Sequence, residues 1–191
     1  FREGGIGFEV IVGDTGSRDP KVLALYDAPP PWLRVVRGLA YHFSRCNNHV
    51  FFAEARHDHA LFLNNDVIFK DSPEALWRMD QALRTDPGLG AVGPVMFFED
   101  GLVQHAGIDV FRNGPLTGFC FHPHGRSELP SLRRPAWSCP AITGACLMIR
   151  GAVFEAIGGF DEGYRTEAQD VALCLAARRL GYDVRVLDLG R

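Results

Sequence analysis

No hydrophobic run in this sequence approaches the roughly 20 consecutive apolar residues that a membrane-spanning helix needs. Neither sign of charge dominates, because 20 Lys and Arg stand against 23 Asp and Glu, for a net charge of −3. This balance excludes a strongly basic protein and gives no indication of a nucleic-acid partner. Internal repeats and low-complexity stretches are also absent, which argues against a repeat array or a long disordered tail.

Cysteine is sparse, its number is odd, and no two cysteines have the CxxC spacing; the five are Cys46, Cys120, Cys139, Cys146 and Cys174. This usage favours a reducing compartment over a disulfide framework. The 191 residues, 47% of them hydrophobic, are enough for one domain with a substantial core. No signal peptide is visible, but the sequence opens and closes close to predicted strands, so we expect a chain truncated at both ends.

The first hundred residues alternate short apolar runs with helical patterns. Strands are predicted at 8–14, 33–37, 59–63 and 89–98, and helices at 21–26, 47–56 and 71–83. The last helix has strong start signals, with Ser72 as N-cap, Pro73 at the first position and Glu74 in the first turn. Either Asn47 or Asn48 is expected to cap the helix before it. This alternation predicts an α/β fold with a mostly parallel sheet flanked by helices.

The pattern changes after residue 100. A hairpin is predicted at 101–111 and a long loop at 112–138, followed by a strand at 141–149, helices at 150–160 and 168–181 and a last strand at 184–189. We therefore expect a single domain over 1–191, with halves of different pattern at 1–100 and 101–191.

Polar side chains stand at the carboxyl ends of two predicted strands. Asp14 follows the first strand, and Asn64, Asn65 and Asp66 follow "HALFL". Three polar side chains in a row do not suit a buried strand, because an unpaired polar group inside costs a few kcal/mol, roughly 2–7. In open α/β sheets, ligands bind at the carboxyl ends of the strands. The same residue types are also common in plain turns, and taken alone a turn is the stronger interpretation of Asn64–Asp66.

Four stretches together carry a family resemblance. They are "EVIVGDTGSRD", "NNHVFFAEARHDHALFLNNDVIF", "VQHAGI" and "TGACLMIRGAVFEAIGGFDEGYRTEAQDVALCLAARRLGYDV". In their order and spacing they resemble family 2 glycosyltransferases of the GT-A fold, in the rhamnosyltransferase-like subgroup. The resemblance implies transfer of a sugar, with inversion, from a UDP- or dTDP-linked sugar to a hydroxyl of a glycan or lipid-linked acceptor, as in polysaccharide biosynthesis. It also implies two parts beyond this sequence: a strand before residue 1 and a metal-binding histidine after Arg191.

The resemblance implies that 1–100 is a nucleotide-binding half and 101–191 an acceptor and catalytic half. It also assigns roles to residues by position. Asp66 stands where the family's Asp-x-Asp motif holds Mg²⁺ or Mn²⁺, ions that prefer oxygen ligands. Asn64 lacks the charge of the usual aspartate and is expected to bind the ribose or a metal-bound water. Asp14 occupies the position that contacts the nucleoside, with a turn as an equal alternative. For Arg45, reaching the nucleotide is the functional interpretation and a surface charge the stronger one.

Asp170 occupies the place of the catalytic base, which deprotonates the acceptor hydroxyl. Gln169 departs from the family, which usually has a glutamate there, and a neighbouring carboxylate would raise the pKa of the base. Helix capping is the simpler explanation of Asp170, and it can coexist with catalysis. The stretches 57–59 ("HDH") and 122–124 ("HPH") lack further ligands at zinc spacing.

Two other function classes compete with an active transferase. A sugar-nucleotide or glycan-binding module that has lost turnover is favoured by Gln169, Asn64 and the missing ends. A metal-dependent phosphohydrolase would need more carboxylates near Asp66 than the sequence offers. The expected location is the cytoplasm, with membrane association only through parts outside this chain.

Overall fold

The computed structural model describes residues 7–54, 58–70, 74–127, 135–165 and 167–190. The strands are β1 (Val10–Gly13), β2 (Leu33–Val36), β3 (His59–Leu63), β4 (Leu89–Pro94), β5 (Met96–Phe97), β6 (Val103–His105), β7 (Asp109–Val110), β8 (Cys120–Phe121), β9 (Ala136–Ser138), β10 (Cys146–Arg150) and β11 (Asp183–Leu187). The helices are α1 (Pro20–Asp27), α2 (Phe43–Glu54), α3 (Ala75–Thr85), α4 (Gly151–Ile157) and α5 (Gln169–Arg179). Within this part of the chain, no helix has the length and apolar content needed to cross a bilayer.

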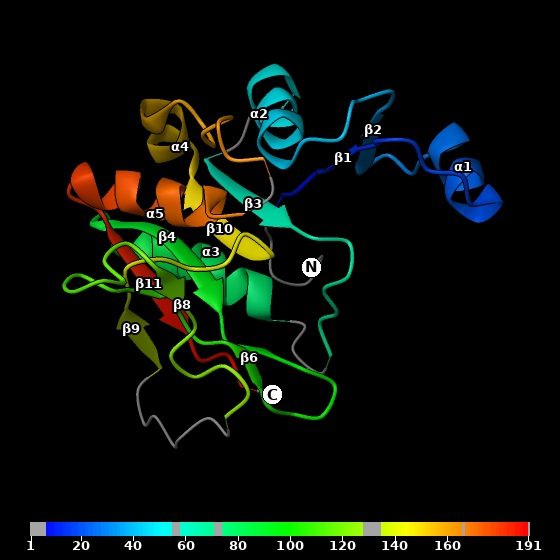
Figure 1. The fold of residues 1–191 in the computed structure, drawn as a ribbon. Coiled ribbons are helices and arrows are strands. Elements are labelled where there is room, and N and C mark those ends of the chain that lie inside the picture. Colours follow the sequence, from blue (N-terminus) through cyan, green and yellow to red (C-terminus); the bar gives the residue numbers. More distant parts are fainter. Residues whose placement is uncertain (1–6, 55–57, 71–73, 128–134, 166, 191) are drawn as a thin grey trace.

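A five-stranded sheet with the order β3-β10-β4-β11-β9 forms the centre of the molecule (Figure 1). The predicted α/β class is confirmed, but the prediction of a mostly parallel sheet is wrong. β10 lies antiparallel between β3 and β4, β9 is antiparallel to β11, and only β4 and β11 pair in parallel. The reason is that β10 enters the sheet from a loop at the edge where β3 ends, so no crossover helix reverses its direction.

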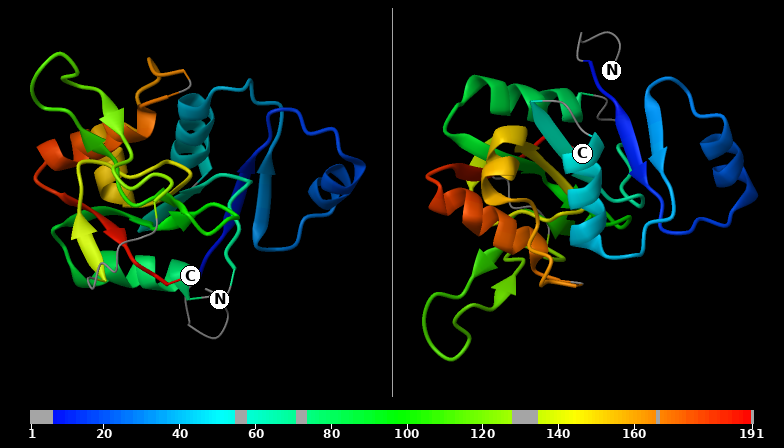
Figure 2. Two further views of the ribbon diagram at one scale, coloured as in Figure 1. Left: turned by 60° about the horizontal axis from the view of Figure 1, so that its bottom comes forward. Right: turned by 90° about the horizontal axis from the view of Figure 1, so that it is seen from above.

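Helices cover both faces of this sheet (Figures 1 and 2). Successive residues of β10 point to opposite faces, as the strand period of two requires. On one side Leu147 and Ile149 join a large core with α2, α4 and α5; on the other side Cys146 and Met148 join a smaller core with Met79 of α3. A strand buried on both faces explains why "ACLMI" is continuously apolar rather than alternating.

β1 and β2 form a parallel pair of their own. With α1 they project to the right of the main body in Figure 1. α1 carries no buried residue, and its start is capped by Asp19, whose side chain accepts from the backbone N–H of Lys21 at 2.7 Å. The first two predicted strands are therefore present, but they do not extend the central sheet.

α2 begins at Phe43, five or six residues earlier than a cap at Asn47 or Asn48 requires. Asn47 and Asn48 lie inside the helix, so neither caps it. Asn48 is buried, and its amide forms two hydrogen bonds of 2.8 Å with the backbone of Phe160. Asn48 therefore does not start the helix but binds the segment before α5 through these two hydrogen bonds. The predicted cap of α3, Ser72, lies outside the described residues, and α3 itself begins at Ala75 after Glu74.

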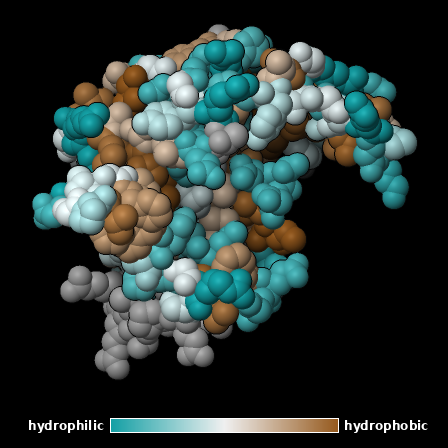
Figure 3. Space-filling view, in the orientation of Figure 1, coloured by the Kyte–Doolittle hydropathy of each residue, from teal (hydrophilic) through white to brown (hydrophobic). Residues whose placement is uncertain are grey.

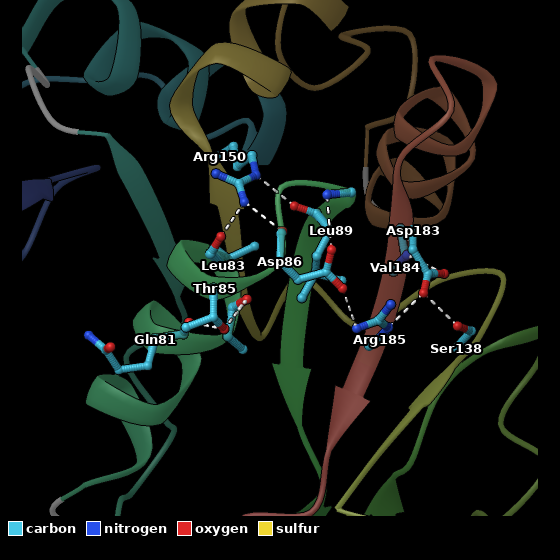
Figure 4. Close-up of polar contacts among 12 residues, drawn as sticks. Gln81, Leu83, Thr85, Asp86, Leu89, Ser138, Arg150, Asp183, Val184 and Arg185 are labelled. Atoms are coloured by element: carbon cyan, nitrogen blue, oxygen red, sulfur yellow. Dashed lines mark hydrogen bonds and ion pairs between the residues drawn. The ribbon is translucent and has the colours of Figure 1, made fainter.

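Arg150, the last residue of β10, holds the end of α3 against the sheet (Figure 4). Its guanidinium donates to the carbonyl oxygens of Leu83, Asp86 and Leu89. Leu83 lies in the last turn of α3, Asp86 follows the helix and Leu89 begins β4, so one side chain joins the helix end to the sheet. Arg185 of β11 extends the network by pairing with the carboxylate of Asp86 at 2.8 Å.

Replacing Arg150 by Met is expected to lower the free energy of unfolding by about 2–4 kcal/mol, because three carbonyl oxygens lose a charged donor at once. Urea denaturation measures this loss. Arg179→Met is the matched control, since Arg179 is exposed in the last turn of α5 and should change stability by less than about 0.5 kcal/mol. Equal midpoints for the two variants would show that Arg150 does not stabilise the end of α3.

Candidate active site

The polar cluster that follows β3 lies at the edge of the sheet where β10 begins. The backbone N–H of Asn64 donates to the carbonyl oxygen of Ala145 at 2.9 Å, and Leu63 is in register with Cys146. Asn64, Asn65 and Asp66 are exposed and form a turn, in which Val67 N–H donates to Asn64 O at 3.4 Å. The turn interpretation is correct as geometry, and this turn presents its side chains to solvent.

Asp170 meets the same edge from the opposite side. It lies in the first turn of α5, where its Oδ1 accepts from the N–H of Val171 at 2.8 Å. Its Oδ2 accepts from the N–H of Gly144 at 2.8 Å. Gly144 and Ala145 are consecutive, so one short segment is hydrogen-bonded to both Asp170 and Asn64. Asp170 and Asn64 are about a hundred residues apart in sequence, and this segment brings them to one edge of the sheet.

The close approach of Asp170 depends on glycine at position 144. A Cβ there would lie 3.3 Å from the Cβ of Asp170 and 3.3 Å from the ring of Phe43. Both contacts are tighter than ordinary van der Waals separation. Ala168, just before α5, has a left-handed backbone with φ of 66°, which is costly for a residue with a Cβ. Strain of this kind is common at functional sites, and here it stands two residues before Asp170.

Gln169 is buried, and its side-chain Oε1 has no hydrogen-bond partner among the described residues. A buried acceptor left unpaired lowers the free energy of unfolding by about 1–3 kcal/mol, so this oxygen destabilises the fold. Glu167, the other candidate for a carboxylate beside Asp170, is exposed. The pairing of two carboxylates that the family usually has at this point is therefore absent from Gln169–Asp170.

Asp14 directly follows β1, which pairs with β2 and not with the five-stranded sheet. Its Oδ1 accepts from the N–H groups of Ser17 at 2.9 Å and Gly16 at 3.4 Å, the arrangement of a side-chain-capped turn. The hydrogen bonds with Ser17 hold the pKa of Asp14 below its ordinary value. The turn alternative for Asp14 thus describes its local geometry, and the charged form that a nucleoside contact would use is favoured.

Arg45 forms an exposed ion pair with Glu162, with Nε and Oε2 3.2 Å apart. An exposed pair of this kind contributes little stability, about 0–1 kcal/mol. Its position is more informative than its strength, because it joins α2 to the segment that leads into α5.

A pair of histidines beside Asp170 was not expected to act together. His105 is buried, and its Nδ1 lies 3.2 Å from Nδ1 of His122. Burial, assisted by the neighbouring His122, lowers the pKa of His105 to about 3. Burial also lowers the pKa of His122, while the negative charge of Asp170 opposes that shift. The stretches "VQHAGI" and "HPH" were the available signals, but nothing in sequence spacing shows that the two rings meet.

Metal coordination by the chain alone would be incomplete. Among the residues that the structure describes, no group of three or more His, Cys, Asp or Glu side chains could hold a metal ion. His57 lies outside the described residues, and His59 is hydrogen-bonded to Asp80 at 2.8 Å. Asp66 offers one exposed carboxylate with an amide oxygen nearby in sequence. That set fits Mg²⁺ or Mn²⁺, which often bind through one or two carboxylates with phosphate oxygens and waters completing the shell.

No family model matches the sequence. It is 32% identical over 182 residues to the uncharacterized protein y4gI of Sinorhizobium fredii, covering 92% of this chain and 20% of that protein. It is also 32% identical over 185 residues to the O-antigen biosynthesis protein RfbC of Myxococcus xanthus, covering 93% of this chain and 14% of that protein. The chain therefore spans only a fifth or less of the length of these relatives.

Three solved structures share this fold over nearly the whole chain. GalNAc-T7, crystallised with UDP, GalNAc and Mn²⁺, matches with a TM-score of 0.70 and 11% identity, over 95% of this chain and 36% of that one. The mannosyltransferase PcManGT from Pyrobaculum calidifontis, in complex with GDP-Man and Mn²⁺, matches with a TM-score of 0.62 and 19% identity, over 96% and 48%. S. aureus TarS matches with a TM-score of 0.58 and 16% identity, over 95% of this chain and 49% of that one. The fold expected from the four sequence stretches is thus confirmed: the chain has the GT-A fold of glycosyltransferases.

Proposed function

We propose that the chain carries the active site of an inverting glycosyltransferase that moves a sugar from a UDP- or dTDP-linked donor to a hydroxyl of a glycan or lipid-linked acceptor. The observation that carries the proposal is the segment Gly144–Ala145, which is hydrogen-bonded to Asp170 on one side and Asn64 on the other. Through it, the candidate base Asp170 and the turn that carries Asp66 share one edge of the sheet. The O-antigen relative supports a glycan product.

In this proposal the donor binds along the edge at which β3 ends. Asp66 and the donor's diphosphate together hold Mg²⁺ or Mn²⁺, and Asn64 contacts the ribose or a metal-bound water. Bound there, the ion neutralises negative charge on the diphosphate as it leaves. Asp14 contacts the nucleoside, and Arg45 adds positive charge near the nucleotide. The two structural neighbours crystallised with UDP or GDP-Man and with Mn²⁺ support a nucleotide-linked donor and a divalent ion in this fold.

Asp170 acts on the acceptor. Its carboxylate takes the proton of the attacking hydroxyl while the oxygen of that hydroxyl bonds to the anomeric carbon of the donor sugar. Attack comes from the side opposite the diphosphate, so the anomeric configuration inverts. The hydrogen bonds from Gly144 and Val171 hold the carboxylate in place and leave it acceptor capacity, since each oxygen can accept more than one bond.

A second candidate function is a sugar-nucleotide or glycan-binding module of the same fold with impaired turnover. Gln169 favours it, because an amide stands where the resembled family usually has a glutamate, and its buried Oε1 has no hydrogen-bond partner among the described residues. Asn64 favours it as well, because it removes one negative charge from the metal site.

Titration calorimetry with the whole protein tests the donor side of the proposal. UDP or dTDP is expected to bind about tenfold or more tightly with Mn²⁺ than with EDTA, because one protein carboxylate and the diphosphate share the ion. GDP serves as the comparison nucleotide for base preference. Equal affinity with and without metal for all three nucleotides would overturn the metal-assisted mechanism.

A further inference from the structure

The protonation of the buried His105 is fixed by its neighbours. Its Nε2 accepts from two backbone N–H groups, those of Gly107 and Thr143, each at 3.4 Å. A neutral imidazole has one N–H, so the proton of His105 must be on Nδ1. The low pKa of His105 keeps the ring neutral at physiological pH. His105 is therefore a donor at Nδ1, and its only partner there among the described residues is His122.

This arrangement fixes His122 as well. Its Nδ1 lies 3.2 Å from Nδ1 of His105, so it must accept the hydrogen bond that the Nδ1–H of His105 donates. The proton of neutral His122 is then on Nε2. His122 is exposed, and its Nε2 has no hydrogen-bond partner within the described part of the chain. His105 thus orients the exposed Nε2–H of His122. In histidines generally, the hydrogen bond made by one ring nitrogen decides whether the other nitrogen carries the proton.

His122 stands beside the proposed base. Thr143 and Gly144 are consecutive, and the N–H of the first binds His105 while the N–H of the second binds Asp170. The charge of Asp170 also reaches the ring of His122, where it opposes the lowering of the pKa by burial. Two backbone amides in a row therefore tie the histidine pair and the carboxylate to one site.

We propose that His122 positions the acceptor: its Nε2–H donates a hydrogen bond to an oxygen of the acceptor saccharide adjacent to the hydroxyl that Asp170 deprotonates. This inference rests on the proposed transferase function. His122 is unsuited to be the base itself, because its Nδ1 is occupied by His105 and its Nε2 already carries the proton. A donor, in contrast, is what binding of a sugar oxygen requires.

The hairpin that carries His122 suits a saccharide. β7 and β8 project from the body on the same side as the segment leading into α5 (Figure 2), and apolar side chains gather there in the space-filling view (Figure 3). Phe111 and Phe119 are exposed on this hairpin, and Phe111 stacks on Phe121 with ring centroids 4.6 Å apart. Exposed aromatic faces beside a few polar groups are typical of small-molecule binding surfaces.

Nitrogen NMR of ¹⁵N-histidine-labelled protein tests the inference without relying on catalysis. We expect His105 to show the Nδ1–H tautomer and His122 the Nε2–H tautomer. Titration with methyl glycosides of glucose, galactose, mannose, rhamnose and N-acetylglucosamine, in the presence of UDP and Mg²⁺, should shift Nε2 of His122 for at least one sugar. An Nδ1–H tautomer at His122, or no shift with any of the five, would overturn the proposal.

Kinetics then separate positioning from structure. His122→Phe is expected to raise the KM for the best methyl glycoside about tenfold or more, with donor KM unchanged, because one hydrogen bond to the acceptor is lost. His122→Gln, which can place an amide N–H near the position of Nε2, should restore most of that loss. His124→Gln, on the same turn, is the control and should match the unmodified protein. An unchanged acceptor KM in His122→Phe would refute the assignment. Sugar-dependent shifts at His122 without any transfer would support acceptor binding and instead refute the transferase proposal.

Discussion

Replacing Asp170 by Asn is expected to lower the rate of sugar transfer by about 10²- to 10⁴-fold, the usual contribution of a general base. Asn has nearly the shape of Asp but cannot accept the proton of the attacking hydroxyl. Donor affinity should stay nearly unchanged, because the proposed donor contacts are made by Asp66, Asn64 and Asp14. The measurement is a transfer assay on the whole protein, run beside a nucleotide titration of the same sample.

The structure adds a cost that the shape of Asn alone does not suggest. Both carboxylate oxygens of Asp170 accept backbone N–H groups, one from Gly144 and one from Val171. An Asn side chain has a single oxygen, so one of these amides would face an NH₂ group and lose its acceptor. The expected destabilisation is about 1–3 kcal/mol. The assay must therefore be run well below the unfolding temperature of the variant.

Asp161→Asn is the matched control. Asp161 is exposed on the segment before α5, and its Oδ1 accepts one backbone N–H, from Gly163 at 2.8 Å. It loses the same charge as Asp170→Asn but is not a proposed active-site residue, so transfer should be unaffected. Unchanged turnover in Asp170→Asn would exclude Asp170 as the base. Absence of turnover in the unmodified protein, with metal-dependent nucleotide binding intact, would favour the binding module.

The sequence predicted the elements of the fold better than their arrangement. Apolar runs and turn residues predict β3 with its exact bounds, because these signals are local. The predicted strand at 89–98 is divided into β4 and β5, which belong to different sheets. The direction of β10 depends on where its preceding loop lies in space, which no local pattern records. Asn48 was misread for a related reason: a polar residue near a helix start usually caps it, and here a tertiary contact with Phe160 overrides that preference.

The candidate site shows the same division. Asn64, Asp66 and Asp170 could be singled out because each interrupts an apolar pattern or matches a motif of a resembled family. The His105–His122 pair could not, because it depends on the tautomer set by the amides of Gly107 and Thr143. Hydrogen-bond partners that are distant in sequence decide such a feature, and they become visible only in the folded chain.

Replacing Asp66 by Ala is expected to abolish the metal dependence of nucleotide binding and to lower transfer by about 10²-fold or more, since metal stabilisation of charge contributes several kcal/mol, about 3 or above. Asp66 is the one carboxylate in the Asn64–Asp66 cluster. Asn64 alone cannot compensate, because a neutral amide oxygen lacks the charge that attracts a divalent ion. Binding of UDP in the presence of Mn²⁺ should fall to the level measured with EDTA.

Because Asp66 is exposed, the variant should separate a loss of metal binding from a loss of stability. The structure gives its side chain no hydrogen bond or ion pair within the described residues, so its removal should change stability by less than about 0.5 kcal/mol. Glu99→Ala removes another exposed carboxylate, from the turn between β5 and β6, and should retain full metal dependence. The two variants have the same net charge, so a difference between them cannot come from general attraction of cations to the protein. Retained metal dependence in Asp66→Ala would place the ion elsewhere and remove the main support for donor binding at the end of β3.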